Sequence, residues 1–313
     1  MMKILVFGGA HIDRRGTLSA PFTPGSSHPG IWHEEAGGGA FNAARCLALL
    51  GHQVTLIAPR GGDAAGDLVT EAAQTCGIID RPFTFLDRST PSYTAILDCD
   101  GNAIAGLADM ELYKLFSPRR LRVRSVREAI SDCDAIFTDA NLPTETLSAI
   151  AQQANLNGKF LAALGISPAK VLRLTEALPQ INCLFINAAE AYALTQESTV
   201  EASLDRLKSL GLGGVVITHG KDMVHAYFND QISVVQPPPC NTIIDVTGAG
   251  DALAGATLSA LLSGSELHIA LRDGIAAAQI TLASRYAVAP NFSEQLLAQT
   301  VQRFTQAKLT FHS

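Results

Sequence analysis

The chain has 313 residues, of which 47% are hydrophobic and 17% are charged, a composition that excludes intrinsic disorder and allows a large buried core. A formal net charge of -6 argues against binding to a nucleic-acid polymer or to an anionic membrane surface. Apolar segments are too short to span a bilayer, and six scattered cysteines suggest neither zinc ligation nor a disulfide framework. We therefore expect a globular, cytoplasmic protein with free thiols that acts on a small molecule.

Short apolar runs alternate with helical patterns along the chain. The runs are typical of strands buried on both faces and lie at 4–7, 54–58, 135–138, 160–164, 183–186 and 215–218. Helical patterns at 40–50 and 144–156 lie between them. This order predicts an α/β fold in which helices flank a doubly wound, mainly parallel sheet, within a single domain that spans residues 1–313.

Two insertions interrupt the alternation of strands and helices. Residues 14–36 are rich in Pro, Gly and Ser, whereas residues 82–109 alternate apolar and polar side chains around an Asp-Gly-Asn turn at 100–102. We predict that both insertions form a small antiparallel β flap, or lid, which closes over a ligand and excludes water. Surface hairpins without a functional role are the alternative.

The strongest local motif is a glycine-rich turn at 245–251, which follows an apolar strand end and precedes a helix predicted at 252–262. Small residues allow backbone N–H groups to approach a phosphate, and the start of the helix favours negative charge. The Asp251 carboxylate would repel that phosphate, so its presence in the turn needs an explanation. A general base that accepts the proton of an attacking hydroxyl group would explain it. A helix cap is the alternative role for Asp251. Neither a Walker A loop nor a dinucleotide-binding G-x-G-x-x-G motif is present.

Two motifs at a characteristic separation carry a resemblance to a known family. The run Asp245-Val246-Thr247-Gly248-Ala249-Gly250-Asp251-Ala252 resembles the C-terminal signature of the PfkB (ribokinase-like) carbohydrate kinases, and Gly37-Gly38-Gly39-Ala40-Phe41-Asn42-Ala43-Ala44 resembles their N-terminal signature. The Asn-x-x-Glu motif at 187–190 and the turn at 218–222 resemble further family motifs. The resemblance covers essentially the whole chain. It implies a ribokinase-like fold and ATP-dependent phosphorylation of a hydroxymethyl group on a sugar or nucleoside.

The resemblance also implies roles for residues on the nucleotide side. Asp251 would be the general base, and an anion hole would be formed by the backbone amides of Gly248, Ala249 and Gly250. Glu190, with Asn187, would organise the water shell of a Mg²⁺ ion, although a solvated first helical turn is the alternative. The ATP would be bordered by Thr218, Gly220 and Lys221, and its adenine by residues 276–280. Asp245 and Thr247 resemble residues that hold K⁺ in many relatives, which leaves K⁺ dependence open.

On the acceptor side, the resemblance implies that Asp13 binds two hydroxyl groups at the carboxyl end of the first strand. Gly38, Gly39 and Asn42 would continue this contact, since glycine permits close approach and an amide both donates and accepts. For Asn42, the alternative is a structural role at the start of a helix. Phe41 is expected in the core, and Tyr93 either stacks on a base or packs in the core.

Short motifs further resemble the pseudouridine kinase branch of the family. They lie at 27–30, 108–110 and 139–141 and at Ser167 and Lys170, and they imply acceptor contacts by Ser27, Asp109, Asn141 and Lys170. One departure is Leu164-Gly165, where many relatives carry Asp-Pro, so a polar contact to the acceptor is expected to be missing. Another PfkB sugar or nucleoside kinase, or a non-catalytic sugar or nucleotide sensor, are the alternatives. Exposed lid edges leave a homodimer open.

Overall fold

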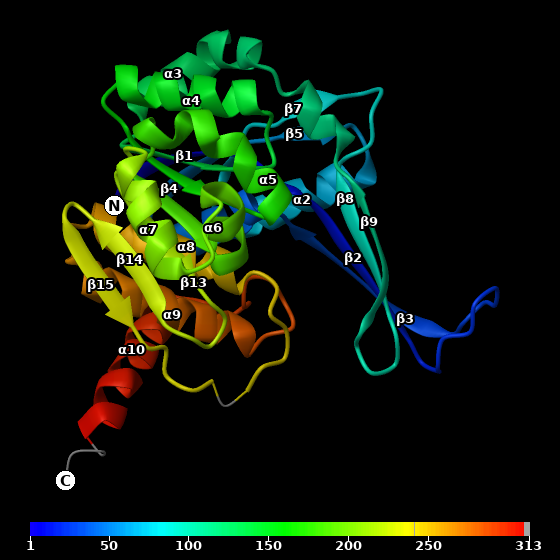
Figure 1. Cartoon of the computed structure of the whole chain (residues 1–313). Coiled ribbons are helices and arrows are strands. Elements are labelled where there is room, and N and C mark those ends of the chain that lie inside the picture. Colours follow the sequence, from blue (N-terminus) through cyan, green and yellow to red (C-terminus); the bar gives the residue numbers. More distant parts are fainter. Residues whose placement is uncertain (241, 310–313) are drawn as a thin grey trace.

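The computed structural model describes residues 1–240 and 242–309 and shows a large sheet between layers of helices (Figure 1). Within these residues, nine strands form the main sheet in the order β15-β14-β13-β12-β11-β10-β1-β4-β6. Their bounds are β1 Lys3–Phe7, β4 Gln53–Ile57, β6 Ile79–Asp80, β10 Ala135–Asp139, β11 Phe160–Leu164, β12 Cys183–Asn187, β13 Gly214–Thr218, β14 Val224–Phe228 and β15 Gln231–Val235. Neighbouring strands are parallel except in the pairs β13–β14 and β14–β15. The predicted doubly wound, mainly parallel sheet is confirmed.

The antiparallel hairpin of β14 and β15 was not predicted from the sequence. Its turn is Asn229-Asp230, and both residues have positive φ angles, of 46° and 63°. These conformations are typical of a two-residue turn whose twist matches that of the flanking strands. Asn-Asp between two alternating segments was the signal that could have revealed the hairpin.

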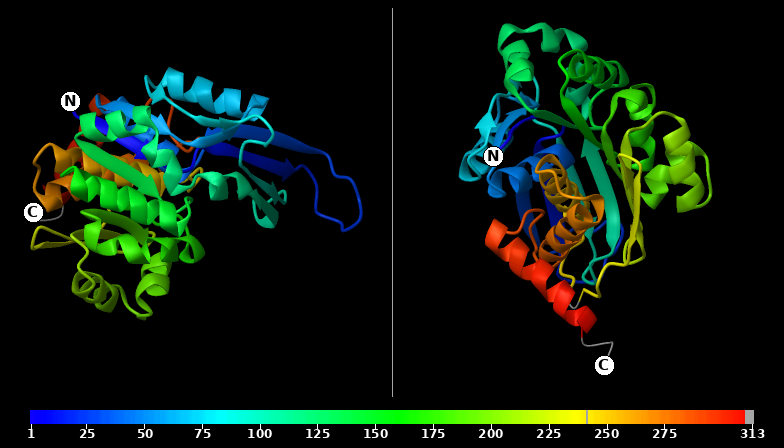
Figure 2. Two further views of the ribbon diagram at one scale, coloured as in Figure 1. Left: turned by 90° about the horizontal axis from the view of Figure 1, so that it is seen from above. Right: turned by 90° about the vertical axis from the view of Figure 1, so that its left-hand side faces the viewer.

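Helices cover both faces of the main sheet (Figure 2). Their bounds are α1 Gly39–Leu49, α2 Ala64–Thr75, α3 Arg124–Asp132, α4 Thr144–Leu156, α5 Pro168–Val171, α6 Ala188–Thr195, α7 Val200–Ser209, α8 Ala249–Leu262, α9 Leu267–Leu282 and α10 Glu294–Leu309. Strand β1 shows why two layers are needed, since its side chains alternate between the faces. Leu5 and Phe7 pack in the cluster that contains α4, α6 and α7, whereas Ile4 and Val6 pack with α1, α8 and α9.

Shorter elements connect the layers. They are β5 Pro59–Gly61, β7 Phe83–Phe85 and the 3₁₀ helices η1 Glu111–Leu115, η2 Pro118–Arg122 and η3 Leu172–Gln180. Strands β5 and β7 pair in a separate two-stranded sheet, so residues 83–85 lie outside the lid sheet even though the lid insertion was expected to start at 82. Helix α8 begins three residues before the predicted position of 252, which places Gly250 and Asp251 in its first turn.

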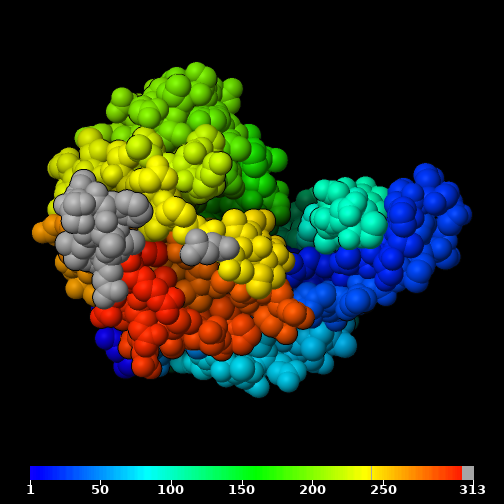
Figure 3. All heavy atoms as spheres, turned by 90° about the horizontal axis from the view of Figure 1, so that it is seen from below, coloured from blue at the N-terminus to red at the C-terminus, as the bar shows by residue number. Residues whose placement is uncertain are grey.

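A four-stranded sheet forms the lid, with the order β3-β2-β8-β9. Its strands are β2 His11–Leu18, β3 Gly30–Gly37, β8 Ser92–Leu97 and β9 Ala103–Asp109. The outer pairs are antiparallel, whereas the central pair, β2 and β8, is parallel. The lid projects from the body, and the surface between them is hollowed (Figure 3). Because β2 follows β1 closely in the chain, the base of the lid lies at the carboxyl end of the main sheet.

Candidate active site

A cavity of about 580 Å³ lies at the carboxyl ends of the parallel strands, beneath the lid. Parallel sheets with helices on both faces bind ligands at this edge. The cavity brings together predicted site residues from distant parts of the chain: Asp13, Gly38, Gly39, Asn42, Asn141, Lys170, Asn187, Glu190, Thr218, Thr247, Gly250 and Asp251. Tyr93, at 41% exposure, lines the cavity from the lid, whereas Phe41 is fully buried in the core. Leu164, Ile166 and Phe185 contribute an apolar wall.

Asp251 lies in the first turn of α8, and its carboxylate faces α1 rather than its own helix end. Asn42 Nδ2 donates a hydrogen bond of 2.8 Å to Asp251 Oδ2, and Asn42 Oδ1 accepts one of 2.5 Å from Arg45. Gly248 is the N-cap residue of α8, with no side-chain cap bond, so the alternative of Asp251 as a helix cap is not supported. Burial raises the pKa of Asp251 to about 6, against the opposing effect of the Asn42 hydrogen bond. This carboxyl group is suited to exchange a proton near neutral pH.

The turn before Asp251 has the geometry of an anion site. Gly248 has a φ of 79°, and a Cβ atom there would lie 2.2 Å from the carbonyl oxygen of Ala287. Gly250 is exposed, and a Cβ atom there would meet nothing within 4 Å. The first N–H groups of a helix have no intrahelical partners, so those at the start of α8 can bind an anion in the open space beside Gly250.

Glu190 and Asn187 form a reciprocal capping box at the start of α6. Asn187 Oδ1 accepts from the Glu190 amide at 2.9 Å, and the Glu190 carboxylate accepts from the Asn187 amide at 3.1 Å and from its Nδ2 at 2.8 Å. Burial raises the pKa of Glu190 to about 7, partly offset by the hydrogen bonds from Asn187. Glu190 is buried, at 4% exposure, so the alternative of a solvated first helical turn is wrong for this side chain, which caps the helix and also lines the cavity.

The departure at Leu164-Gly165 has a packing explanation. A Cβ atom at residue 165 would lie 2.5 Å from Glu190 Oε2 and 2.7 Å from Ile186 Cγ2, so only glycine allows this position of Glu190. The next residue, Ile166, has a φ of 73°, which is strained for a β-branched side chain. Leu164 and Ile166 therefore give the cavity an apolar wall at this point, as expected from the absence of the Asp-Pro pair.

Asp13 is held by residues that sequence reasoning missed. Its Oδ1 lies 3.3 Å from His11 Nε2, and His11 Nδ1 is 2.8 Å from the hydroxyl of the buried Tyr113. A Cβ atom at Gly37 would lie 2.0 Å from Asp13 Oδ2, so part of the glycine run accommodates this carboxylate. The signal for His11 was its position two residues before Asp13, on the same face of a strand.

Asp139, also missed as a site residue, organises the acceptor end of the cavity. It is fully buried and accepts backbone hydrogen bonds from Gly9, Ala40 and Asn141, as well as one from the Asn141 side chain. Asn141 Oδ1 in turn accepts a 2.7 Å hydrogen bond from Lys170 Nζ. Burial lowers the pKa of Lys170. One carboxylate therefore fixes the end of β1, the start of α1 and the side chain that holds Lys170.

Two of the predicted acceptor residues, Ser27 and Asp109, do not line this cavity in the described part of the chain. Ser27 is exposed in the loop between β2 and β3, and Asp109 is exposed at the end of β9. Ser27 belongs to the outer loop of the lid, whereas Asp109 lies at the base of the lid between Ala108 and Met110, which both line the cavity.

A second cavity, of about 570 Å³, adjoins the first and shares Thr218, Gly250 and Leu253 with it. It contains the predicted nucleotide residues Gly220 and Lys221, and its walls are largely apolar, formed by Pro237, Pro238, Pro239, Val246, Ala278 and Leu282. Of the residues expected near adenine, Ala278 and Gln279 line it, whereas Ala276 is buried in the core. The two cavities meet at the start of α8.

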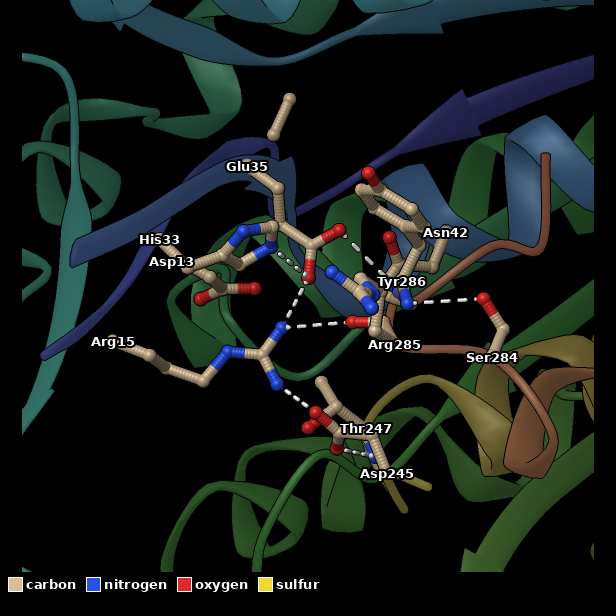
Figure 4. A network of polar contacts seen from close by, with 12 residues as sticks. Asp13, Arg15, His33, Glu35, Asn42, Asp245, Thr247, Ser284, Arg285 and Tyr286 are labelled. Atoms are coloured by element: carbon tan, nitrogen blue, oxygen red, sulfur yellow. Dashed lines mark hydrogen bonds and ion pairs between the residues drawn. The ribbon is translucent and has the colours of Figure 1, made fainter. Parts of the chain in front are cut away.

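A polar network connects the lid to the glycine-rich turn (Figure 4). Arg15 of β2 contacts the carboxylate of Asp245 and donates hydrogen bonds to Glu35 of β3 at 2.6 Å and to the Arg285 carbonyl at 3.3 Å. The other carboxylate oxygen of Asp245 accepts from the Thr247 amide at 2.8 Å. Arg15 and Glu35 were not predicted as site residues, because nothing local marks a partner 230 positions away.

Comparisons with known proteins agree on one family. The model of the pfkB family carbohydrate kinases matches residues 1–294. A carbohydrate kinase from Agrobacterium tumefaciens is 51% identical, with a TM-score of 0.89 over 96% of this chain and 97% of that one. The pseudouridine kinase of Escherichia coli is 27% identical over 93% of both sequences. Arabidopsis thaliana ribokinase, solved with ribose and ATP, shares the fold at 20% identity, with a TM-score of 0.83 over 96% of this chain and 99% of that one.

None of the described helices combines the length and hydrophobicity needed to cross a bilayer.

Proposed function

The chain belongs to the pfkB family of carbohydrate kinases, and we propose that it transfers the γ-phosphoryl group of ATP to the 5′-hydroxyl group of a nucleoside, with pseudouridine as the acceptor. The observation that carries this proposal is the Asp251 carboxylate, which is held by Asn42 and lines the first cavity one residue after Gly250, where the two cavities meet. A base and an anion site are adjacent there, as phosphoryl transfer to an alcohol requires.

The reaction follows from this geometry. The acceptor hydroxyl gives its proton to Asp251 Oδ1 or Oδ2 as its oxygen forms a bond to the γ-phosphorus, and the bond from that phosphorus to the bridging oxygen of ADP breaks. The amides at the start of α8 stabilise the charge on the transferred group. Because the pKa of Asp251 is raised only to about 6, the carboxylate is mostly ionised at pH 7 and remains basic enough to accept the proton.

The nucleotide side fits ATP with Mg²⁺. The apolar walls of the second cavity suit a purine base, and Thr218, Gly220 and Lys221 line the same cavity, which extends to Gly250 at the anion site. Glu190 and Asn187 present carboxylate and amide oxygens to the first cavity, the donor type that Mg²⁺ prefers, and both are engaged with each other, which favours contact through water. When bound there, the ion would neutralise phosphate charge.

Features of the first cavity support a nucleoside as acceptor. Asp13, oriented by His11, can accept hydrogen bonds from two ribose hydroxyls. Asn141 and Lys170 offer polar groups farther along the cavity, while Leu164 and Tyr93 offer surfaces that can cover a base. The short motifs shared with pseudouridine kinases and the 27% identity to one of them favour pseudouridine within this class.

The test is MgATP turnover by the purified protein with pseudouridine, uridine, cytidine, adenosine, ribose and fructose, with Asp251→Asn as the blank. Pseudouridine is expected to have the highest kcat/KM, and the substitution is expected to lower kcat by about a hundredfold or more, because the base is lost. Preference for another acceptor would replace pseudouridine and leave the kinase assignment intact. Turnover of no acceptor above the Asp251→Asn blank would overturn the assignment.

A further inference from the structure

Arg15 closes a ring of contacts beside the glycine-rich turn, and Figure 4 shows its bonds to Asp245 and Glu35. Its guanidinium group joins Asp245 to Glu35, and Glu35 Oε2 accepts a 3.4 Å hydrogen bond from the Ala287 amide. Ala287 packs closely against Gly248, since a Cβ atom at residue 248 would lie 2.2 Å from the carbonyl oxygen of Ala287. The ring is completed by Asp245, which holds the Thr247 amide immediately before the anion site.

The ring is largely shielded from water. The side chains of Arg15, Glu35 and Asp245 are 18%, 8% and 20% exposed. Charge-assisted hydrogen bonds in such partly buried positions are stronger and less screened than surface ion pairs. The neighbouring Arg14 offers a contrast, because its bond to Glu34 is exposed and does not reach the body of the protein.

The centre of the ring has the donor set of a cation site. Carboxylate oxygens of Asp245 and Glu35 and the carbonyl oxygen of Arg285 line one position, with Asp245 on one guanidinium nitrogen of Arg15 and the other two oxygens on the second, and such oxygens suit a hard monovalent cation. That position is filled by the Arg15 guanidinium group, while the second oxygen of Asp245 is occupied by the Thr247 amide.

We propose that Arg15 is a positioning residue that serves as the built-in cation of this kinase: it fixes the glycine-rich turn in its anion-binding conformation and joins the turn to the lid, so that a bound monovalent cation is not required. The inference rests on the proposed ATP-binding role of the turn. It does not depend on the identity of the acceptor.

Nucleotide binding tests the proposal without an acceptor. The Kd of the Mg²⁺ complex of a non-hydrolysable ATP analogue is measured by calorimetry in KCl and in tetramethylammonium chloride at equal ionic strength. For the unaltered protein, the two values are expected to agree within about twofold, since the guanidinium group already neutralises Asp245. A much higher Kd in tetramethylammonium chloride would overturn the proposal.

Substitution of Arg15 provides the second arm, with Arg14→Ala as the matched control. Arg15→Ala is expected to raise the Kd by about tenfold in tetramethylammonium chloride, and KCl is expected to restore most of the loss by filling the vacated oxygens. Arg15→Lys keeps the positive charge but cannot contact both carboxylates with a planar guanidinium group, so its Kd in tetramethylammonium chloride should rise less than that of Arg15→Ala. Arg14→Ala should match the unaltered protein in both salts.

The K⁺ rescue separates a positioning role from a purely structural one, because a general loss of folding would not depend on the cation. Thallium, whose anomalous signal marks K⁺ sites, is expected beside Asp245 in crystals of Arg15→Ala and to be absent there in the unaltered protein. Arg15→Ala with an unchanged Kd in both salts, or with an equal loss in both, contradicts the proposal. Failure to bind the ATP analogue by the unaltered protein would instead overturn the proposed function.

Discussion

Asp251 is the residue whose environment most directly connects stability with function. Its raised pKa of about 6 reflects loss of solvation, with the Asp139 and Asp13 carboxylates adding to the same direction. Asn42 opposes this effect by donating to the ionised form. The folded protein thus holds this carboxylate in a position where ionisation is less favourable than in water, which is common at sites that transfer protons.

We expect the pH dependence of activity and the pH dependence of stability to have opposite signs for this residue. Activity requires the ionised carboxylate, so kcat/KM with MgATP should fall as the pH drops through about 6. The folded-state pKa lies above the unfolded value of 3.8, so the folded state binds more protons between the two values. The contribution of Asp251 to the free energy of unfolding therefore decreases as the pH rises from about 4 to 6.

The Asp251→Asn variant checks both signs. It should be inactive and yet more stable than the unaltered protein at pH 7, by about 1 kcal/mol, because a buried charge is removed. Urea denaturation at pH 7 and at pH 5 measures this difference, which should shrink at the lower pH. A variant that is destabilised at pH 7 would show that the Asn42–Asp251 hydrogen bond outweighs the desolvation of the carboxylate.

At the scale of elements, the start of α8 depends on two glycines with different physical reasons. Gly248 has a left-handed conformation and no room for a side chain, since the Ala287 carbonyl lies against it. Gly250 is in the first turn of the helix, with open space where a Cβ atom would be. The first glycine is required by the fold, whereas the second leaves room for a ligand.

Substitution of these glycines should separate folding from function. Gly248→Ala is expected to lower the free energy of unfolding by about 2 kcal/mol or more, because it combines strain with a clash. Gly250→Ala is expected to raise it by about 0.5 kcal/mol, since alanine favours the helix, while kcat/KM falls by about tenfold as the methyl group enters the phosphate space. Chemical denaturation and steady-state kinetics measure both effects. Full activity of Gly250→Ala would show that the phosphate lies elsewhere.

For the molecule as a whole, the lid determines whether the site is complete. In this structure the lid is joined to the body through Arg15 and Glu35, while its outer part, which includes the loop between β2 and β3, projects away from the body (Figure 1). Tyr93 lines the cavity and remains 41% exposed. We therefore expect the outer lid to move toward the body when an acceptor binds, with the Arg15 contacts as its fixed end.

Hydrogen exchange should detect this movement. Amides of residues 19–29 and 98–102, which lie in the lid loops, are expected to exchange more slowly when the acceptor and a non-hydrolysable ATP analogue with Mg²⁺ are both bound, because closure shields them. Helix α4 packs with α6 and α7 on one face of the main sheet, outside the lid, and serves as the control whose exchange should not change. Equal exchange of the lid loops with and without both ligands would contradict lid closure.

The sequence by itself determined the class of fold and much of the site. Strands such as β10 and β11 are buried on both faces, so their uninterrupted apolar runs indicate a parallel sheet without knowledge of distant contacts. The turn at 245–251 likewise predicts an anion site from local sequence, because such a site is formed by backbone amides of adjacent small residues and by the start of the following helix. Asp13, Asn42 and Glu190 were identified through motifs of the same local kind and line the cavity.

Only the tertiary structure decided which side chains hold these groups in place. Asp139 binds amides from the segment after β1, from α1 and from its own loop. Tyr113 reaches His11 across 102 positions, and Arg15 reaches Asp245 across 230. Each is an ordinary polar residue in its local sequence, and its role arises from strand order and from the crossing of the lid over the sheet edge. Local patterns encode backbone conformation and motif chemistry, whereas contacts between distant segments depend on how the whole chain packs.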